Sequence, residues 1–179
     1  MNIKYGNMLD VIYESNAEVL VVTTNGFVKK NGRNVMGMGI AWQVLNELPD
    51  IDLMYGSLIK EEGHKVHIIN HPDSDVPVVM FPVKPVTKVI TDMNQVVGHM
   101  YGNCTVGQEA PGWATTADLA IIEQSAKQLK ELADTHGWKR VIAPRFGCGA
   151  GELSWEDVEP VVAPYLDDRF DIYTFKKNP

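Results

Sequence analysis

A chain of 179 residues, 45% of them hydrophobic and 22% charged, is long enough to bury the core of one globular domain. Its formal net charge of −7 argues against broad binding of nucleic acids, which requires a basic face. No apolar run approaches the roughly 18 residues needed to span a bilayer, and the N-terminus lacks a signal-peptide pattern. The two cysteines do not make a disulfide framework. We therefore expect a single cytoplasmic domain over residues 1–179, without membrane association and with no obligate protein partner evident.

The pattern of apolar residues predicts strands that alternate with helices along the chain. Strands are expected in 3–13 (as short strands), 18–24, 66–69, 76–81, 139–143 and 169–175, and helices in 39–48, 50–61, 115–136 and 155–166. Residues 93–114 show no period and contain four glycines, which is typical of a long loop or small lid. Alternating strands and helices predict a three-layer α/β domain with a mixed, largely parallel sheet.

Two loops that contain glycine each precede a predicted helix. The first is Val35–Ala41, and the second runs from Pro144 to a helix start that Ser154 and Asp157 mark as a capping pattern. Glycine lets the backbone come close to a ligand, and unpaired N–H groups at a helix start attract anions. Two such loops predict two backbone cradles around one phosphate-bearing ligand. The alternative is that the glycines serve only tight turns between strand and helix.

These residues resemble the macro domains, a family that binds ADP-ribose. The resemblance runs nearly end to end, and its motifs are Gly6-Asn7-Met8-Leu9, Thr24-Asn25-Gly26, Val35–Ala41 and Pro144–Gly151. It implies a three-layer α/β/α fold. Within the family, Phe81-Pro82-Val83-Lys84 is similar to the strand-end lysine of terminal ADP-ribose protein glycohydrolases and of antitoxin-type enzymes that remove ADP-ribose from DNA bases. In both groups this lysine is implicated in catalysis. The protein glycohydrolases carry an aspartate where this chain has Gly151.

The resemblance implies that the ligand is ADP-ribose, either free or attached to a protein or nucleic acid, and that no cofactor is needed. The diphosphate would lie between the two glycine loops, and the adenine near the first motif and the last strand. The expected ligand-binding residues are Asn7, Met8, Leu9, Val35, Met36, Gly37, Met38, Gly39, Ile40, Arg145, Phe146, Gly147, Cys148, Gly149, Ala150, Gly151 and Phe175. An aromatic side chain of the last strand, Phe175 or Tyr173, would stack on the adenine; for either residue, packing in the core is the alternative.

Three side chains are candidates for catalysis. The amine of Lys84 would attack the anomeric carbon if burial or nearby cations depress its pKa; otherwise Lys84 is a solvated lysine at a strand end. Asn25 would orient the distal ribose, because an amide both donates and accepts, or it would only form an Asn-Gly turn. Glu152 is the nearest carboxylate and the candidate general acid, or simply a polar residue near a helix start. Trp113 and Tyr101 would cover the ligand from the long loop.

Metal and thiol chemistry are weaker alternatives. His64, His67 and His71 are close in sequence, but no cysteine or carboxylate completes a tetrahedral set, so we expect no metal site. Cys148 lies near a helix start, where a thiol pKa can fall, yet no partner base is evident. We expect a hydrolase that removes ADP-ribose from a modified macromolecule with a lysine nucleophile. The alternatives are an ADP-ribose 1″-phosphate phosphatase and a non-catalytic reader or sequestering protein for ADP-ribose or a related nucleotide signal.

Overall fold

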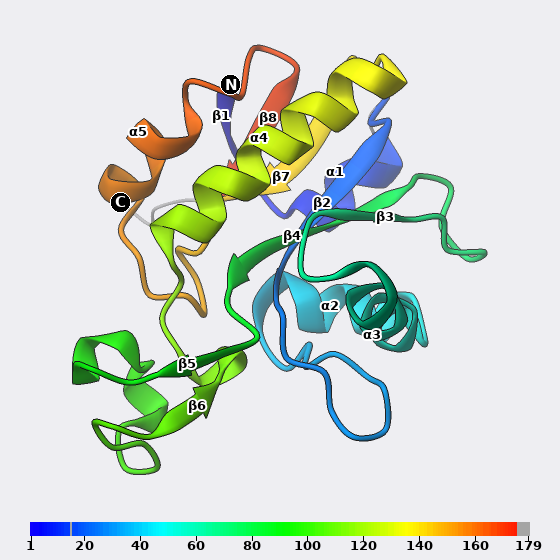
Figure 1. Ribbon diagram of the computed structural model, residues 1–179. Coiled ribbons are helices and arrows are strands. Elements are labelled where there is room, and N and C mark those ends of the chain that lie inside the picture. Colours follow the sequence, from blue (N-terminus) through cyan, green and yellow to red (C-terminus); the bar gives the residue numbers. More distant parts are fainter. Residues whose placement is uncertain (15, 175–179) are drawn as a thin grey trace.

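A six-stranded sheet runs through the middle of the molecule (Figure 1). The computed structural model describes residues 1–14 and 16–174. Its strands are β1 (Asn2–Tyr5), β2 (Val19–Asn25), β3 (His67–Ile69), β4 (Val78–Lys84), β7 (Val141–Pro144) and β8 (Phe170–Thr174). They lie in the order β1-β8-β7-β2-β4-β3, and every neighbouring pair is parallel except β3 and β4. The prediction of a mixed, largely parallel sheet is confirmed.

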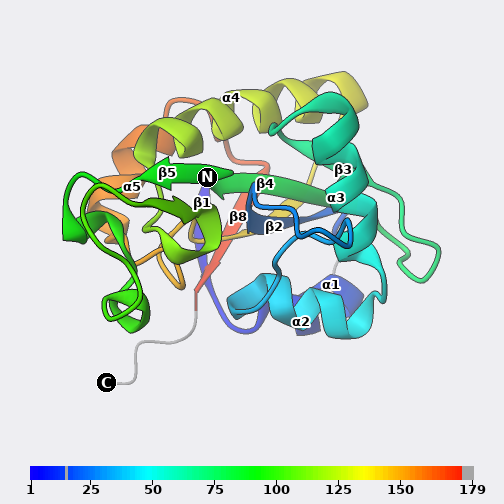
Figure 2. The same ribbon diagram turned by 60° about the horizontal axis from the view of Figure 1, so that its bottom comes forward.

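Helices cover both faces of this sheet (Figure 2). One layer holds α4 (Leu119–His136) and α5 (Trp155–Val162), and the other holds α1 (Met8–Glu14), α2 (Gly39–Glu47) and α3 (Ile51–Glu62). Successive side chains of a strand point to opposite faces. In β2, Val19 and Val21 therefore pack in the core under α4 and α5, while Leu20 and Val22 pack in the core over α1 to α3. Among the described helices, none is long and apolar enough to cross a bilayer.

The predicted helix ends are present where local signals mark them. The Asp118 side chain accepts a hydrogen bond from the Ala120 amide, and Gly137 ends α4 in the left-handed conformation with φ 68°. Ser154 Oγ accepts from the Asp157 amide at 3.2 Å and so begins α5. That helix ends at Val162, before the predicted Leu166, because Pro164 has no N–H to continue it.

The short strands predicted over residues 9–13 are wrong: this stretch belongs to α1. β1 ends at Tyr5, Gly6 turns the chain with φ 140°, and Asn7 Oδ1 accepts a hydrogen bond from the Leu9 amide at 3.2 Å. Met8 and Leu9 are then buried against the sheet. Over so few residues an apolar pattern fits either period, and the tertiary contact decides which one forms.

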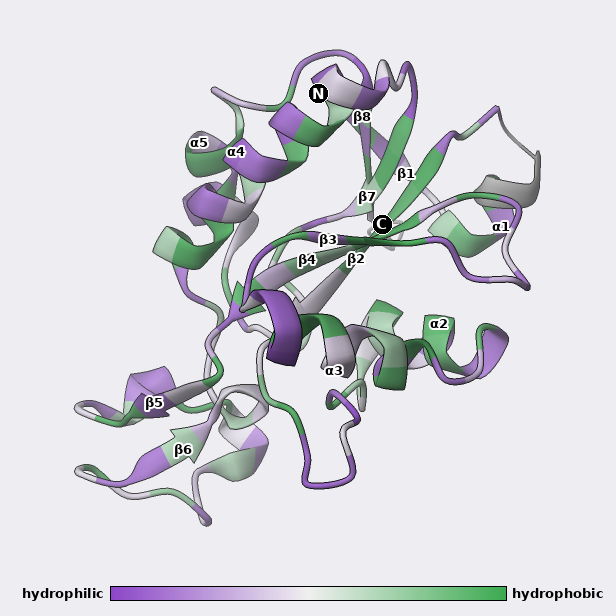
Figure 3. Cartoon of the chain, turned by 45° about the vertical axis from the view of Figure 1, so that its right-hand side comes forward, coloured by the Kyte–Doolittle hydropathy of each residue, from purple (hydrophilic) through white to green (hydrophobic). Residues whose placement is uncertain are grey.

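The long loop predicted over 93–114 has regular structure of its own. Strand β5 (Thr87–Val89) pairs antiparallel with β6 (Glu109–Pro111), and three 3₁₀ turns, Met93–Gln95, Gly98–Met100 and Gly112–Ala114, complete it. A small apolar core forms from Ile90, Val96, Cys104, Ala110 and Ala114. We call residues 87–114 the insertion; it projects beside the main sheet (Figure 3). Elements of three residues are too short to produce a readable period, which is why the sequence pattern shows none.

Candidate functional site

A bulge at the carboxyl ends of β2 and β4 brings two of the predicted catalytic side chains together. Thr24 of β2 is opposite Pro82, but the next residue, Asn25, is opposite Lys84, so Val83 is an extra residue in β4. In parallel α/β sheets, ligands bind at the carboxyl ends of the strands. The register shift therefore places Asn25 and Lys84 side by side at the edge where a ligand would bind.

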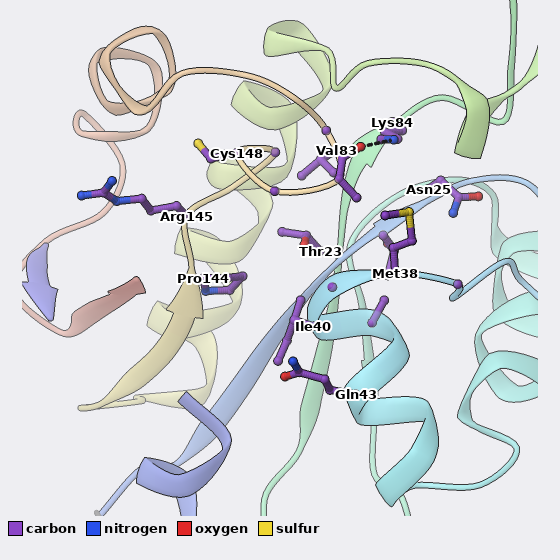
Figure 4. Close-up of a pocket in the computed structure, with 18 of the residues that line it drawn as sticks. Thr23, Asn25, Met38, Ile40, Gln43, Val83, Lys84, Pro144, Arg145 and Cys148 are labelled. Atoms are coloured by element: carbon purple, nitrogen blue, oxygen red, sulfur yellow. Dashed lines mark hydrogen bonds between the residues drawn. The ribbon is translucent and has the colours of Figure 1, made fainter. Parts of the chain in front are cut away.

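A cavity of about 480 Å³ opens at this edge, between the two glycine loops. This volume is within the range of small-molecule sites. The predicted residues on its wall are Asn7, Met8, Asn25, Val35, Gly37, Met38, Gly39, Ile40, Lys84, Arg145, Gly147, Cys148, Gly149, Ala150 and Gly151. Figure 4 shows Lys84, Asn25 and Met38 on one side of this space, with Arg145 and Cys148 on the other.

Other predicted ligand-binding residues lie elsewhere. Leu9 and Met36 are buried in the core over α1 to α3, and Phe146 stacks on Phe81 in the opposite core with ring centroids 4.4 Å apart. Each is a sequence neighbour of a residue on the cavity wall, such as Met8, Val35 and Arg145. Phe175 lies outside the described residues. Tyr173, two residues earlier in β8, packs on the side of the sheet that α1 covers and is on the cavity wall.

Both glycine loops present unused amide groups to the cavity. In the described part of the chain, the N–H groups of residues 37–41 and of 149–151 donate no hydrogen bond. In the first set, residues 39–41 form the opening turn of α2, where backbone donors have no acceptor within the helix, and residues 37 and 38 directly precede it. Converging free N–H groups form an anion site, and a helix N-terminus adds its dipole.

The second loop is closed so tightly that glycine is required in it. Gly147 has φ 71°, and a Cβ added there would lie 2.8 Å from the Cβ of Ala117. A Cβ at Gly151 would collide with the carbonyl oxygen of Gly147 and lie 2.7 Å from Ala117 Cβ. The loop as built therefore has no room for the aspartate that the protein glycohydrolases carry at the position of Gly151.

Lys84 is buried, with 6% of the residue exposed, so it is not the solvated lysine of the alternative interpretation. Its Nζ donates to the Ala150 carbonyl at 2.7 Å, the dashed line in Figure 4, and to the Trp113 carbonyl at 3.4 Å. Burial lowers the pKa of Lys84 from 10.5 to about 8, although the charge of Glu152 opposes this. About a tenth of the Lys84 amines are therefore neutral at pH 7, and a neutral amine is nucleophilic.

The loop after β2 fixes the side-chain amide of Asn25. Its Nδ2 donates to the Val35 carbonyl at 2.7 Å, and its Oδ1 accepts from the Phe27 amide at 2.9 Å. A second N–H and a second lone pair remain on the amide group. Asn25 thus joins the strand end to the first glycine loop and still has capacity for a ligand.

Glu152 is not among the residues of the cavity wall. It has φ 59°, and both of its carboxylate oxygens accept from the Gly98 amide, at 3.0 and 3.1 Å. This contact joins the second glycine loop to the insertion. No aspartate or glutamate is among the described wall residues, and the cations Lys84 and Arg145 are, so the cavity favours an anion.

The thiol and the histidines do not form a further reactive centre among the described residues. Burial raises the pKa of Cys148 to about 11, opposite to the fall that a helix start can cause, and its Sγ donates to the Phe146 carbonyl. His67 Nε2 bonds to the Gly63 carbonyl and His71 Nε2 to the Pro49 carbonyl. The described residues hold no cluster of three potential metal ligands.

Several further wall residues were not among the predicted ligand-binding residues. Five of them, Gly6, Thr24, Ala41, Val83 and Pro144, lie within the quoted motifs. The other four, Thr23, Gln43, His99 and Thr174, lie outside these motifs, although Thr23 directly precedes one. His99 could not be found from the motifs, because it comes from a 3₁₀ turn of the insertion. Trp113 lies on the wall as expected, and Tyr101 lies off it, exposed.

The fold of this chain is similar to the folds of several solved structures. No family model matches the sequence. The macrodomain of Mycobacterium tuberculosis DarG is similar, with TM-score 0.64 and 23% identity over 97% of this chain and 98% of that one. The macrodomain of Thermus aquaticus DarG gives 0.67 and 19%, over 98% and 97%. Thermosipho africanus DarTG in complex with ADP-ribose gives 0.69 and 20%, over 99% of this chain and 43% of that one.

A curated relative is also similar in sequence. It is the DNA ADP-ribosyl transferase-DNA ADP-ribosyl glycohydrolase fusion protein of Thermosipho africanus, 23% identical over 162 residues. The match covers 78% of this chain and 34% of the relative, so the chain spans about a third of the relative's length.

Proposed function

This chain has the macrodomain fold, and we propose that it binds ADP-ribose and removes it by hydrolysis from a modified macromolecule. The observation that carries the proposal is the buried Lys84, with its pKa lowered to about 8, at one end of a cavity lined by two sets of free amide groups. A binding site alone needs the amides. It does not need an amine that is costly to bury.

The cavity suits the parts of ADP-ribose in order. The diphosphate lies between the amides of 37–41 and those of 149–151. The dipole of α2, which begins at Gly39, adds about 0.3–1 kcal/mol. The distal ribose lies beside Asn25 and Lys84. The adenosine end extends toward Asn7 and Tyr173, at the carboxyl end of β8.

The chemistry follows from the neutral amine. Lys84 Nζ attacks the anomeric carbon C1″, and the bond from C1″ to the leaving atom breaks with its electron pair remaining on that atom, which also takes up a proton. The glycosylamine opens to a Schiff base. Water then adds at C1″, and the bond to Nζ breaks, so that one water molecule is consumed and free ADP-ribose and lysine are released.

ADP-ribosylated DNA is the first substrate to test. The fusion protein's name includes a DNA ADP-ribosyl glycohydrolase, and two of the similar structures are DarG macrodomains. The net charge of −7 does not oppose this substrate, because the local anion site would bind the ADP-ribose and not the DNA backbone. ADP-ribosylated protein is the comparison substrate.

Calorimetry and turnover test the proposal together. ADP-ribose should bind with a Kd near 1 μM, about −8 kcal/mol, and ADP and NAD more weakly because they lack a free distal ribose in the pocket. Lys84→Ala should abolish release of ADP-ribose and keep binding. The matched control is Lys139→Ala. Lys139 is exposed and lies before the amino end of β7, at the opposite end of the strands from the cavity. Full turnover by a folded Lys84→Ala protein would eliminate the lysine mechanism.

One observation favours a second function, a non-catalytic reader of ADP-ribose. The described cavity wall has no carboxylate that could act as a general acid. A reader would bind ADP-ribose as tightly and release none from DNA or protein at any pH, so the same two measurements separate the two functions.

A further inference from the structure

A wall without carboxylates needs another source for the proton that the leaving atom takes up. The described wall side chains that can carry a proton to it are Lys84, His99, Cys148 and Tyr173. Lys84 acts as the nucleophile, the Cys148 thiol is hydrogen-bonded to a carbonyl, and Tyr173 lies at the end of the cavity assigned above to the adenosine. Imidazole is the side chain that both gives and takes a proton readily near neutral pH. Building on the function proposed above, we infer that His99 is the acid–base residue of the reaction and that Glu152 holds it in place.

The backbone around His99 is fixed from several directions. The Gly98 amide donates to both carboxylate oxygens of Glu152, and the Val97 amide donates to the Ala114 carbonyl at 3.0 Å. The Val97 side chain is fully buried. The His99 side chain itself is exposed and lies on the cavity wall. A rigid backbone that carries an accessible imidazole is the arrangement that an acid–base residue requires.

The insertion meets the cavity at the end where the reaction would occur. Its Trp113 carbonyl accepts from Lys84 Nζ, and Trp113 also lies on the wall. Glu152 follows directly on Gly151, the last residue of the second amide cradle. The insertion is therefore joined to the nucleophile through Trp113 and to the diphosphate cradle through the Gly98 amide, which directly precedes His99. The charged groups on this wall are Lys84 from β4 and Arg145 from the loop after β7. The carboxylate of Glu152 is not on the wall and accepts a hydrogen bond from the Gly98 amide.

The proton steps balance over one turnover. Protonated His99 gives its ring proton to the leaving atom as the bond to C1″ breaks, and the bonding pair stays on that atom. Neutral His99 then takes a proton from the water that adds to C1″. The water oxygen stays on C1″, the Lys84 nitrogen recovers its bonding pair, and His99 is again protonated.

The test compares two leaving groups. Single-turnover rates are measured for wild type and His99→Asn with an ADP-ribosylated DNA oligonucleotide, whose leaving atom needs a proton, and with 4-nitrophenyl ADP-ribose, whose phenolate leaves without one. His99→Asn should slow the first substrate about 100-fold or more and the second by less than about threefold. The alkaline fall in the wild-type pH profile with the oligonucleotide should disappear in His99→Asn. His136→Asn, an exposed histidine at the end of α4, is the matched control and should match wild type.

Glu152 positions His99, and the rates and pH profiles of two Glu152 variants test this role separately. Glu152→Gln keeps an oxygen that can accept from the Gly98 amide and should retain most of the rate with the oligonucleotide. Glu152→Ala removes the acceptor and should slow that substrate about tenfold, with the alkaline fall in the pH profile still present. If Glu152 were itself the acid, Gln would be as slow as Ala and the alkaline fall would be lost.

The outcomes separate this inference from the proposed function. Equal slowing of both substrates by His99→Asn, or unchanged rates, would overturn the role of His99 while leaving the hydrolase in place. Wild-type protein that binds ADP-ribose but turns over neither substrate would overturn the hydrolase and His99 with it. Calorimetry on His99→Asn should give the wild-type affinity for ADP-ribose; a lost affinity would mean that His99 binds and does not catalyse.

Discussion

At the scale of single residues, Lys84 shows how a reactive group is made from an ordinary one. The side chain is an unremarkable lysine in the sequence, and its pKa of about 8 arises because burial disfavours the charged form. The folded protein must then carry either a desolvated cation or a neutral amine at neutral pH. Both cost stability, so this position is one where function and stability oppose each other.

We predict that Lys84→Met stabilises the protein at pH 7. Between pH 8 and 10.5 the unfolded chain binds more protons at Lys84 than the folded chain does, so wild-type stability rises with pH across this window. Below about pH 8 the full penalty of burial is present. Chemical denaturation should show Lys84→Met more stable by roughly 1–2 kcal/mol at pH 7. This advantage should shrink toward pH 10; an advantage that stays constant with pH would mean that the lysine charge is not its cause.

At the scale of elements, the second glycine loop is the part whose shape depends most on the absence of side chains. Gly147 takes a left-handed φ, and Gly151 packs against the Gly147 carbonyl and Ala117. The Ala117 amide also donates to the Gly151 carbonyl at 2.9 Å, so the loop is bonded to the residue before the cap of α4. This packing holds the amides of 149–151 toward the cavity.

We predict that one alanine substitution in this loop lowers affinity and stability and that a second one changes stability little. Gly151→Ala places a Cβ against backbone and must open the loop, which should lower the affinity for ADP-ribose about tenfold or more and cost about 1–3 kcal/mol of stability. A Cβ at Gly149 meets no atom within 4 Å, and its φ is not positive, so Gly149→Ala should cost little stability. Calorimetry and thermal unfolding of both variants check this; equal losses would show that the packing around Gly151 does not set the loop.

At the scale of the whole molecule, the cavity is assembled from parts that are far apart in the chain. β2, β4, β7, β8, both glycine loops and the insertion all contribute to one wall. The insertion has a small core of its own and is joined to the rest by contacts such as Lys88 with Asp118, 3.2 Å apart, and Glu152 with Gly98. A ligand that filled the cavity would therefore contact several of these parts at once.

We predict that ADP-ribose stabilises sheet and insertion together. At about 100 times Kd it should add about 2.7 kcal/mol to the free energy of unfolding. Amide exchange should slow most at 37–41 and 149–151, whose N–H groups are unpaired in the described structure, and also across the insertion. The C-terminal half of α4, which lies off the cavity wall, reports the slowing that comes from global stabilisation alone. Slowing confined to the two loops would show that the insertion does not close on the ligand.

Much of the architecture was predictable because its signals are local. The run of β-branched and apolar residues in β2, the glycine after α4 and the cap at Ser154 each depend on a few neighbouring residues. The stretch 9–13 and the insertion were not predictable, since short elements carry too few residues to define a period. In the site, the two loops and Lys84 were found from motifs, whereas Leu9, Met36 and Phe146 turned out to face the core. One residue along a loop separates the two directions, and only packing selects between them.

The sequence by itself determined the layers, the two amide cradles and the lysine at the end of a strand, because glycine, capping residues and apolar spacing act over short distances. Only the tertiary structure decided the rest. The bulge that sets Asn25 opposite Lys84, the burial that lowers the lysine pKa and the contact of Glu152 with Gly98 all join segments distant in the chain. Such contacts depend on how the layers pack, and packing is a property of the whole chain.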